Sequence, residues 1–176
     1  IHKEYLAIVQ EWPEWTETAC TAPILRQGEV AESRIWVKQA VHPAGKACTT
    51  VFRKERTWNT RRGPLALVRC IPETGRMHQI RVHLSHLGHS LLGDPLYKPR
   101  HKRPTLPGGF ARQALHAWRL TLAHPATGET VRYIAPMARD MKHLLNELRA
   151  QRDNRALDDE FDDDEDFDDD GVEVIY

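Results

Sequence analysis

The chain has 176 residues, of which 40% are hydrophobic, and its 25 basic and 25 acidic residues cancel to a formal net charge of zero. This length suits one domain with its own core, and the sequence has no run of about 18 apolar residues that would cross a membrane. Three well-separated cysteines, at positions 20, 48 and 70, argue against a disulfide framework or a zinc knuckle and are typical of a reducing cytosol.

The overall neutrality conceals an uneven distribution of charge along the chain. Residues 158–176 contain 12 of the acidic residues and no Lys or Arg, which leaves 25 basic against 13 acidic residues, or +12, in residues 1–157. A strongly basic body favours a polyanionic partner, and nucleic acid is the first candidate. The alternative is that these Lys and Arg residues only keep a small domain soluble.

The first 72 residues are predicted to be rich in β-structure. Runs of β-branched and aromatic residues bounded by turn residues indicate strands, and we expect strands at 4–10, 34–41, 48–55 and 65–71. Residues 11–33 are expected to be mostly loop with one short strand, and 42–45 a turn. The chain begins with Ile1 just before the first strand, and we expect it to be a fragment of a longer domain.

The hydrophobic period changes after Gly75. Apolar positions then recur at the spacing i, i+3, i+4, i+7, which predicts a short amphipathic helix carrying Ile80, His83, Leu84 and Leu87. Gly88 stands where a glycine commonly ends a helix. A β-hairpin is predicted from strands at 114–123 and 129–134, followed by a second helix from about Pro136 to Arg152.

The end of the chain has the composition of a disordered segment. A block of like charge such as DDEFDDDEDFDDDG cannot bury enough apolar surface to fold. We therefore predict one domain at 1–152 and a disordered acidic tail at 153–176, which either shields a basic cleft or aids solubility. Since strands outnumber helices and connections are short, the fold class is predicted to be α+β with an antiparallel-rich sheet.

Four histidines in residues 73–97, His78, His83, His86 and His89, raise the question of a metal site. A pair of histidines at i, i+3 on a helix can chelate zinc, but no Asp, Glu or Cys shares that helical face and no H-E-x-x-H pattern is present. His83 also belongs to the apolar stripe, where a hydrogen-bonded core histidine is the usual explanation. We therefore do not expect these histidines to bind a metal.

Two arginines in the same stretch, Arg76 and Arg81, have a different context. Arg81 lies off the apolar stripe of the predicted helix, and an Arg held on a rigid element can pair bidentately with a carboxylate or a phosphate. The strand–turn–helix arrangement also directs backbone N–H groups at an anion. On these residues alone, an ordinary surface Arg is equally compatible with the pattern.

The stretch ETGRMHQIRVHLSHLGHSLLGDPLY, residues 73–97, resembles the signature of the RluA family of RNA pseudouridine synthases. That signature reads T-G-R-x-H-Q-I-R-V-H followed by G-H-x-L-x-G-D-x-x-Y. Three further segments agree in family order, namely the K-x-Y strand at 3–9, the G-K-x-A-x-T-x-F segment at 45–52 and the R-Q-x-L-H-A strand at 112–117. The resemblance covers residues 1 to about 150.

The resemblance implies a mixed, mainly antiparallel sheet with a few flanking helices and an RNA-binding cleft. It implies isomerisation of uridine to pseudouridine in rRNA or tRNA without a metal or a cofactor. The target base must leave its stack to be reached. We further expect a cytoplasmic protein that acts as a monomer. The alternative is a non-catalytic RNA-binding module of the same fold, or, from the histidines, a metal-dependent hydrolase.

The resemblance also implies roles for particular residues. The family's catalytic Asp lies in an R-L-D-x-x-T-S-G-like segment upstream of K-x-Y, and these 176 residues contain no such segment. Tyr5 matches the active-site Tyr that packs against the target base, and Arg81 matches the Arg that pairs with the catalytic Asp. Leu92 is expected to line the uracil pocket, whereas Asp94 is expected to be structural, pairing with a nearby Arg or capping a turn.

RNA contacts are expected on both sides of the predicted helix that carries Arg81. Arg and Lys side chains in loops commonly bind phosphates. The candidates are Arg76 and His78 at the start of the helix and the basic loop residues Lys98, Arg100, Lys102 and Arg103. A loop that is simply solvated is an equally good explanation for the last four.

Overall fold

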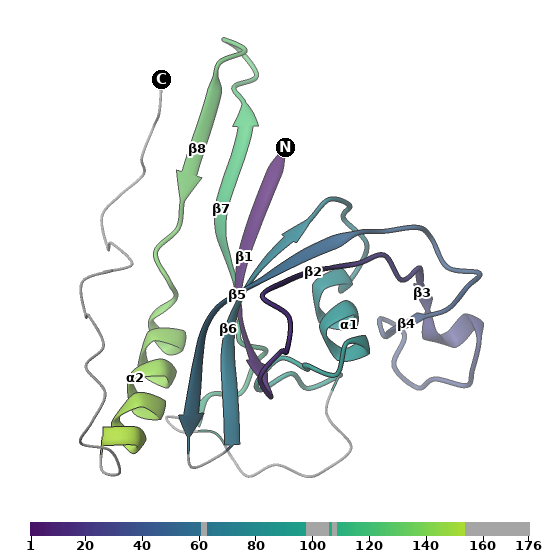
Figure 1. Cartoon of the computed structure of the whole chain (residues 1–176). Coiled ribbons are helices and arrows are strands. Elements are labelled where there is room, and N and C mark those ends of the chain that lie inside the picture. The colour runs from purple at the N-terminus through teal and green to yellow at the C-terminus, as the bar shows by residue number, and fades with distance from the viewer. Residues whose placement is uncertain (61–62, 98–105, 107–108, 154–176) are drawn as a thin grey trace.

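The computed structural model describes residues 1–60, 63–97, 106 and 109–153 and shows an α+β fold (Figure 1). Its main sheet has six strands in the order β2-β5-β6-β1-β7-β8. Their bounds are His2–Gln10 (β1), Glu17–Cys20 (β2), Thr50–Thr60 (β5), Gly63–Pro72 (β6), Leu115–Ala123 (β7) and Thr130–Ile134 (β8). The predicted fold class is therefore confirmed, although every pairing among the described strands is antiparallel rather than mixed.

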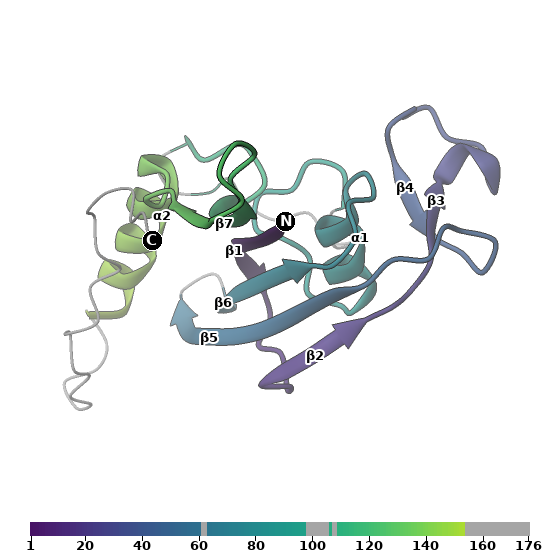
Figure 2. The same ribbon diagram turned by 90° about the horizontal axis from the view of Figure 1, so that it is seen from above.

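The two helices pack against opposite faces of this sheet. Side chains along β1 alternate between the faces, as the geometry of a strand requires. Leu6 and Ile8 join the cluster of α2, Arg139–Asp153, whereas Ala7 and Val9 join the cluster of α1, Gln79–His86. Figure 2 shows α2 and α1 on either side of β1. Because both faces of the central strand are covered, β1 is largely buried from Leu6 to Gln10.

A small second sheet extends beyond the main one, beside α1 (Figures 1 and 2). It pairs β3, Ile24–Arg26, with β4, Gln39–Val41, and a short 3₁₀ turn at Gln27–Glu29 lies between them. We call residues 24–46 the arm. Gly45 closes it, because a Cβ at this position would lie 2.7 Å from backbone atoms of Ile24. Only a glycine permits that approach.

Most predicted elements are present, and two of them differ in extent. The predicted strand at 34–41 is confirmed only at 39–41, because β3 offers just three residues to pair with, and Ile35, Trp36 and Val37 remain exposed. The predicted strand at 48–55 continues to Thr60, where the ladder with β6 ends. Of the acidic tail predicted at 153–176, Asp153 ends α2 and the remainder lies outside the described residues.

Candidate functional site

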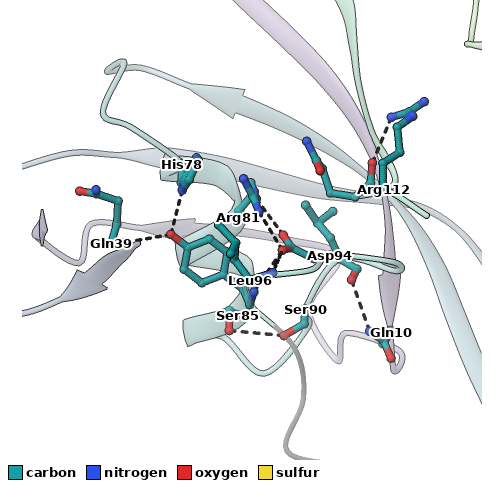
Figure 3. Close-up of polar contacts among 12 residues, drawn as sticks. Gln10, Gln39, His78, Arg81, Ser85, Ser90, Asp94, Leu96 and Arg112 are labelled. Carbon is teal, nitrogen blue, oxygen red and sulfur yellow. Dashed lines mark hydrogen bonds and ion pairs between the residues drawn. The ribbon is translucent and has the colours of Figure 1, made fainter. Parts of the chain in front are cut away.

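Arg81 is held by a buried, bidentate ion pair with Asp94. Its Nε donates to Asp94 Oδ2 and its Nη2 to Asp94 Oδ1, each at 2.8 Å (Figure 3). The Arg81 side chain is 10% exposed and that of Asp94 is 1% exposed. Arg81 is therefore not an ordinary surface residue. The expectation that Asp94 pairs with a nearby Arg is confirmed, and so is its role in a turn, because its Oδ1 also accepts the backbone N–H groups of Leu96 and Tyr97.

The carboxylate of Asp94 is charged because its partners outweigh its burial. Burial alone would raise its pKa, but the hydrogen bonds from Arg81 and from the N–H groups of Tyr97 and Leu96 bring this pKa below its ordinary value. Gly93 makes the tight turn before it with a φ of +73°, and a Cβ there would lie 2.3 Å from the carbonyl oxygen of Arg112. The Gly-Asp sequence thus places one ionised carboxylate against the helix that carries Arg81.

Tyr97 extends this group toward the arm. Its hydroxyl oxygen accepts the backbone N–H of Gln39 at 2.9 Å and lies 3.0 Å from Nδ1 of His78. Its ring lies below the guanidinium of Arg81, with 5.1 Å between the ring centroid and Cζ. Figure 3 shows the contact that His78 makes beside the ion pair of Arg81 with Asp94. His78 itself adopts a left-handed conformation, with φ at 54°, as the residue that precedes α1.

His83 is a fully buried core residue, as the apolar stripe predicts. Its Nδ1 lies 2.9 Å from Oγ1 of Thr50, and its Nε2 lies 2.9 Å from the carbonyl oxygen of Ala22 and 3.4 Å from Sγ of Cys48. Burial lowers the pKa of His83, which favours the neutral ring. Within the described part of the chain, no three His, Cys, Asp or Glu residues gather as a metal ion would require.

Gln79 anchors the start of α1 to the main sheet. Its amide oxygen accepts hydrogen bonds from the Thr74 hydroxyl and the Arg76 N–H, and its amide nitrogen donates to the Thr49 carbonyl and the Thr50 hydroxyl. This buried side chain therefore satisfies four polar groups at once. It ties the start of α1 to β5, and with it the position of Arg81 two residues further along the helix.

The predicted site residues divide between the two faces of the sheet. Half-buried Tyr5 packs against the apolar cluster that holds Ile80 of α1. Leu92 is 3% exposed and belongs to the cluster of α2, whereas Tyr5 packs against the other cluster. Half-buried Leu115, which lies opposite Ala7 on β7, packs against the same cluster as Tyr5.

The predicted RNA contacts are only partly described. Arg76 is exposed, and its Nε and Nη2 donate to the carbonyl oxygen of Ala47 at 3.3 Å. His78 contacts Tyr97 as described above. Lys98, Arg100, Lys102 and Arg103 lie outside the described residues. The arm adds a surface that the sequence did not identify, because the Trp36 side chain is 74% exposed and the guanidinium of Arg26 lies 3.9 Å from its ring centroid.

The sequence also did not identify Tyr97 and Gln39 as part of the site. Tyr97 ends the G-D-x-x-Y pattern, so its position in the signature was the available signal. Gln39 contributes a backbone N–H, which any residue other than proline would supply. No pattern of side chains could therefore have indicated Gln39.

Comparison with known proteins identifies several similar sequences and folds. The profile of the family described as RNA pseudouridylate synthase matches residues 1–86. Proteins named ribosomal large subunit pseudouridine synthase D are similar, including those of Neisseria meningitidis (43% identical over 128 residues), Haemophilus influenzae (46% over 120) and Xanthomonas campestris (38% over 157). The matches cover 62%, 63% and 85% of this chain.

Two solved human structures have a similar fold. RNA pseudouridylate synthase domain containing 1 superposes with a TM-score of 0.61 at 24% identity, over 85% of this chain and 66% of that one. RNA pseudouridylate synthase domain containing 4 gives a TM-score of 0.60 at 23% identity, over 84% and 62%. The matches with the three bacterial proteins cover only 34%, 36% and 44% of their lengths, so this chain spans less than half of each. No described helix is long and apolar enough to cross a membrane.

Proposed function

This chain belongs to the RluA family of RNA pseudouridine synthases, and from that premise we propose that it supplies the Tyr5 and Arg81 side of an active site that isomerises uridine in RNA to pseudouridine. The family profile matches the region that contains both β1 and α1. The observation that carries the proposal is the buried guanidinium of Arg81, which Asp94 fixes by two hydrogen bonds of 2.8 Å. Such a group is oriented before any substrate arrives.

The reaction needs a carboxylate that this sequence does not identify. The bond between C1′ and N1 of the uridine breaks, the uracil turns, a bond forms between C1′ and C5, and a proton moves from C5 to the solvent while N1 gains one. We assign the catalytic carboxylate to an Arg-Leu-Asp type segment outside these 176 residues. Arg81 would hold that carboxylate ionised and in place, since a neighbouring guanidinium favours the charged form. Asp94 keeps Arg81 itself in place.

The apolar part of the site is proposed to lie on the α1 face of the sheet. Tyr5 is half-buried there and can pack against a base that has left its stack. Leu115, on the adjacent strand, is a better candidate than Leu92 for the apolar wall of the uracil pocket, because it is half-buried beside the same cluster. Leu92, at 3% exposed, offers a base very little surface.

The RNA is proposed to be that of the large ribosomal subunit rather than tRNA. The names of the similar bacterial proteins support this choice. The net charge of +12 in residues 1–157 supports a polyanionic partner. The arm supports it as well, because exposed Trp36 with Arg26 on its ring has the composition of a surface on which single-stranded bases stack. The three buried free thiols favour a cytoplasmic location.

A second candidate function is an RNA-binding module without catalysis, because the net charge of +12 in residues 1–157 and the exposed Trp36 would serve RNA binding alone equally well. One experiment separates the two. The complete protein that contains this sequence is incubated with transcripts of large-subunit rRNA and of tRNA, and pseudouridine is measured by mass spectrometry after nuclease digestion. We expect pseudouridine in the rRNA, none in the tRNA, and none with the 176-residue chain alone. RNA binding without any pseudouridine would establish the non-catalytic module instead.

A further inference from the structure

Tyr97 lies where three segments of the chain meet. It belongs to a small apolar cluster with Ile24 of the arm, Val82 of α1 and Cys48, against which Val41 and Leu96 also pack. This cluster packs between the arm and α1, where Val82 is the residue that follows Arg81. Tyr97 is 7% exposed, so its ring is part of that packing while its hydroxyl group points at the arm and at the start of α1.

The hydrogen bonds of the Tyr97 hydroxyl have a defined direction. The backbone N–H of Gln39 can only donate, so the Tyr97 oxygen accepts from it at 2.9 Å. The hydroxyl proton is then available for Nδ1 of His78 at 3.0 Å. Burial and the nearby Arg81 lower the pKa of His78, although Asp94 opposes them, which favours a neutral ring with an unprotonated Nδ1. One hydroxyl group thus connects β4 to the residue before α1.

We propose that Tyr97 is a positioning residue, which ties the arm to the first turn of α1 and thereby holds Arg81 in the orientation that the reaction needs. This inference rests on the proposed function. The backbone N–H of Tyr97 binds Asp94, its ring lies 5.1 Å from the guanidinium of Arg81, and its hydroxyl joins Gln39 to His78. RNA bound at the arm would therefore act on Arg81 through this side chain. A weaker contact, from Nε2 of Gln39 to Sδ of Met77 at 3.5 Å, runs parallel to it.

The substitution Tyr97→Phe tests this role because it removes the hydroxyl and keeps the ring. The matched control is Tyr133→Phe, which removes a hydroxyl from the exposed side chain of Tyr133 on β8. The first measurement is the pKa of His78, from ¹⁵N spectra of the histidine-labelled chain, with His78→Asn used to assign the signal. We expect Tyr97→Phe to raise this pKa by about 0.5–1 unit, because the neutral ring loses one hydrogen bond. Tyr133→Phe should leave it unchanged.

The second measurement uses the complete protein and its RNA. Tyr97→Phe is expected to lower the single-turnover rate about tenfold while the Kd for RNA changes less than about twofold, as a loss of orientation requires. A His78 pKa that does not move would show that the hydroxyl does not bind His78 and would overturn the proposal. A changed pKa with an unchanged rate would overturn it too, because the contact would then be only structural. An unsubstituted protein that makes no pseudouridine would overturn the proposed function, and the role of Tyr97 with it.

Discussion

Two Arg–Asp pairs in this molecule have the same fork geometry in different surroundings. Arg81 and Asp94 form two hydrogen bonds of 2.8 Å with side chains that are 10% and 1% exposed. Arg112 and Asp140 form two of 2.6 and 2.7 Å with side chains that are 37% and 46% exposed. Each guanidinium also lies near an aromatic ring, that of Tyr97 or of Phe110. The pairs therefore differ mainly in their access to water.

This difference determines what each pair can do. An exposed pair gains little, because water and salt compete for both charges. A buried pair is costly to form, but removal of one member leaves a charge without a partner and is strongly destabilising. Arg81 and Asp94 are thus held in one arrangement, which suits a group that must orient another carboxylate. Arg112 joins the segment before β7 to the start of α2, and it also donates to the carbonyl oxygens of Gln113 and Leu115.

Removal of each carboxylate should reveal the largest difference between the pairs. We expect Asp94→Ala to lower the free energy of unfolding by about 3–5 kcal/mol, because Arg81 stays buried without a counter-charge. Asp140→Ala should cost at most about 1 kcal/mol. Urea unfolding followed by tryptophan fluorescence measures both. Equal losses for the two variants would show that burial does not distinguish the pairs.

A substitution at Gly93 tests the contact between the turn that precedes Asp94 and the backbone at Arg112. A Cβ at this position would lie 2.3 Å from the Arg112 carbonyl oxygen, and φ is +73°. Gly93→Ala should therefore cost about 2–4 kcal/mol, from a strained backbone and a displaced neighbour. Gly128→Ala is the matched control, since its φ of +76° is similar but open space surrounds it, and it should cost only about 1 kcal/mol. Similar losses at both glycines would argue against the close contact.

Salt should change the pKa of Asp140 more than that of Asp94. Hydrogen bonds from Arg112 lower the pKa of Asp140, and the partners of Asp94 lower its pKa against its burial. Both folded pKa values lie below the unfolded ones, so each pair stabilises the protein above about pH 4 and loses this effect as the pH falls through the folded pKa. From about 0.1 to 1 M NaCl, carboxyl ¹³C spectra should show the pKa of Asp140 rising toward 3.8 and that of Asp94 staying low. A parallel rise of both would mean that Asp94 is open to solvent.

The sequence predicted the elements with a strong local pattern and missed what depends on distant partners. The stripe from Ile80 to Leu87 predicted α1, and the turn at 125–128 predicted the hairpin. The strand expected at 34–41 shortened because its length depends on β3, which has only three residues. Leu92 was predicted to line the uracil pocket, and its burial in the α2 cluster could not be predicted from neighbouring residues.

The same limit applies to the candidate site. The signature at 73–97 pointed to Arg81 and the K-x-Y segment to Tyr5, and the family's pairing of Arg81 with a catalytic Asp remains a prediction. The pair that the structure shows, Arg81 with Asp94, joins residues thirteen positions apart, and the sequence predicted only that Asp94 pairs with a nearby Arg or caps a turn. The link from Tyr97 to Gln39 crosses 58 positions and ends on a backbone N–H, which leaves no trace in the sequence.

The central claim is that Arg81 orients the catalytic carboxylate rather than binding an RNA phosphate. Its most direct test is Arg81→Lys in the complete protein, with Arg112→Lys as the control, by single-turnover rate and by RNA affinity at several salt concentrations. Lys keeps the charge and loses the planar fork. We predict a rate at least about a hundredfold lower for Arg81→Lys, with RNA affinity within about threefold and an unchanged salt dependence, and near-normal values for Arg112→Lys. A near-normal rate for Arg81→Lys would contradict the claim.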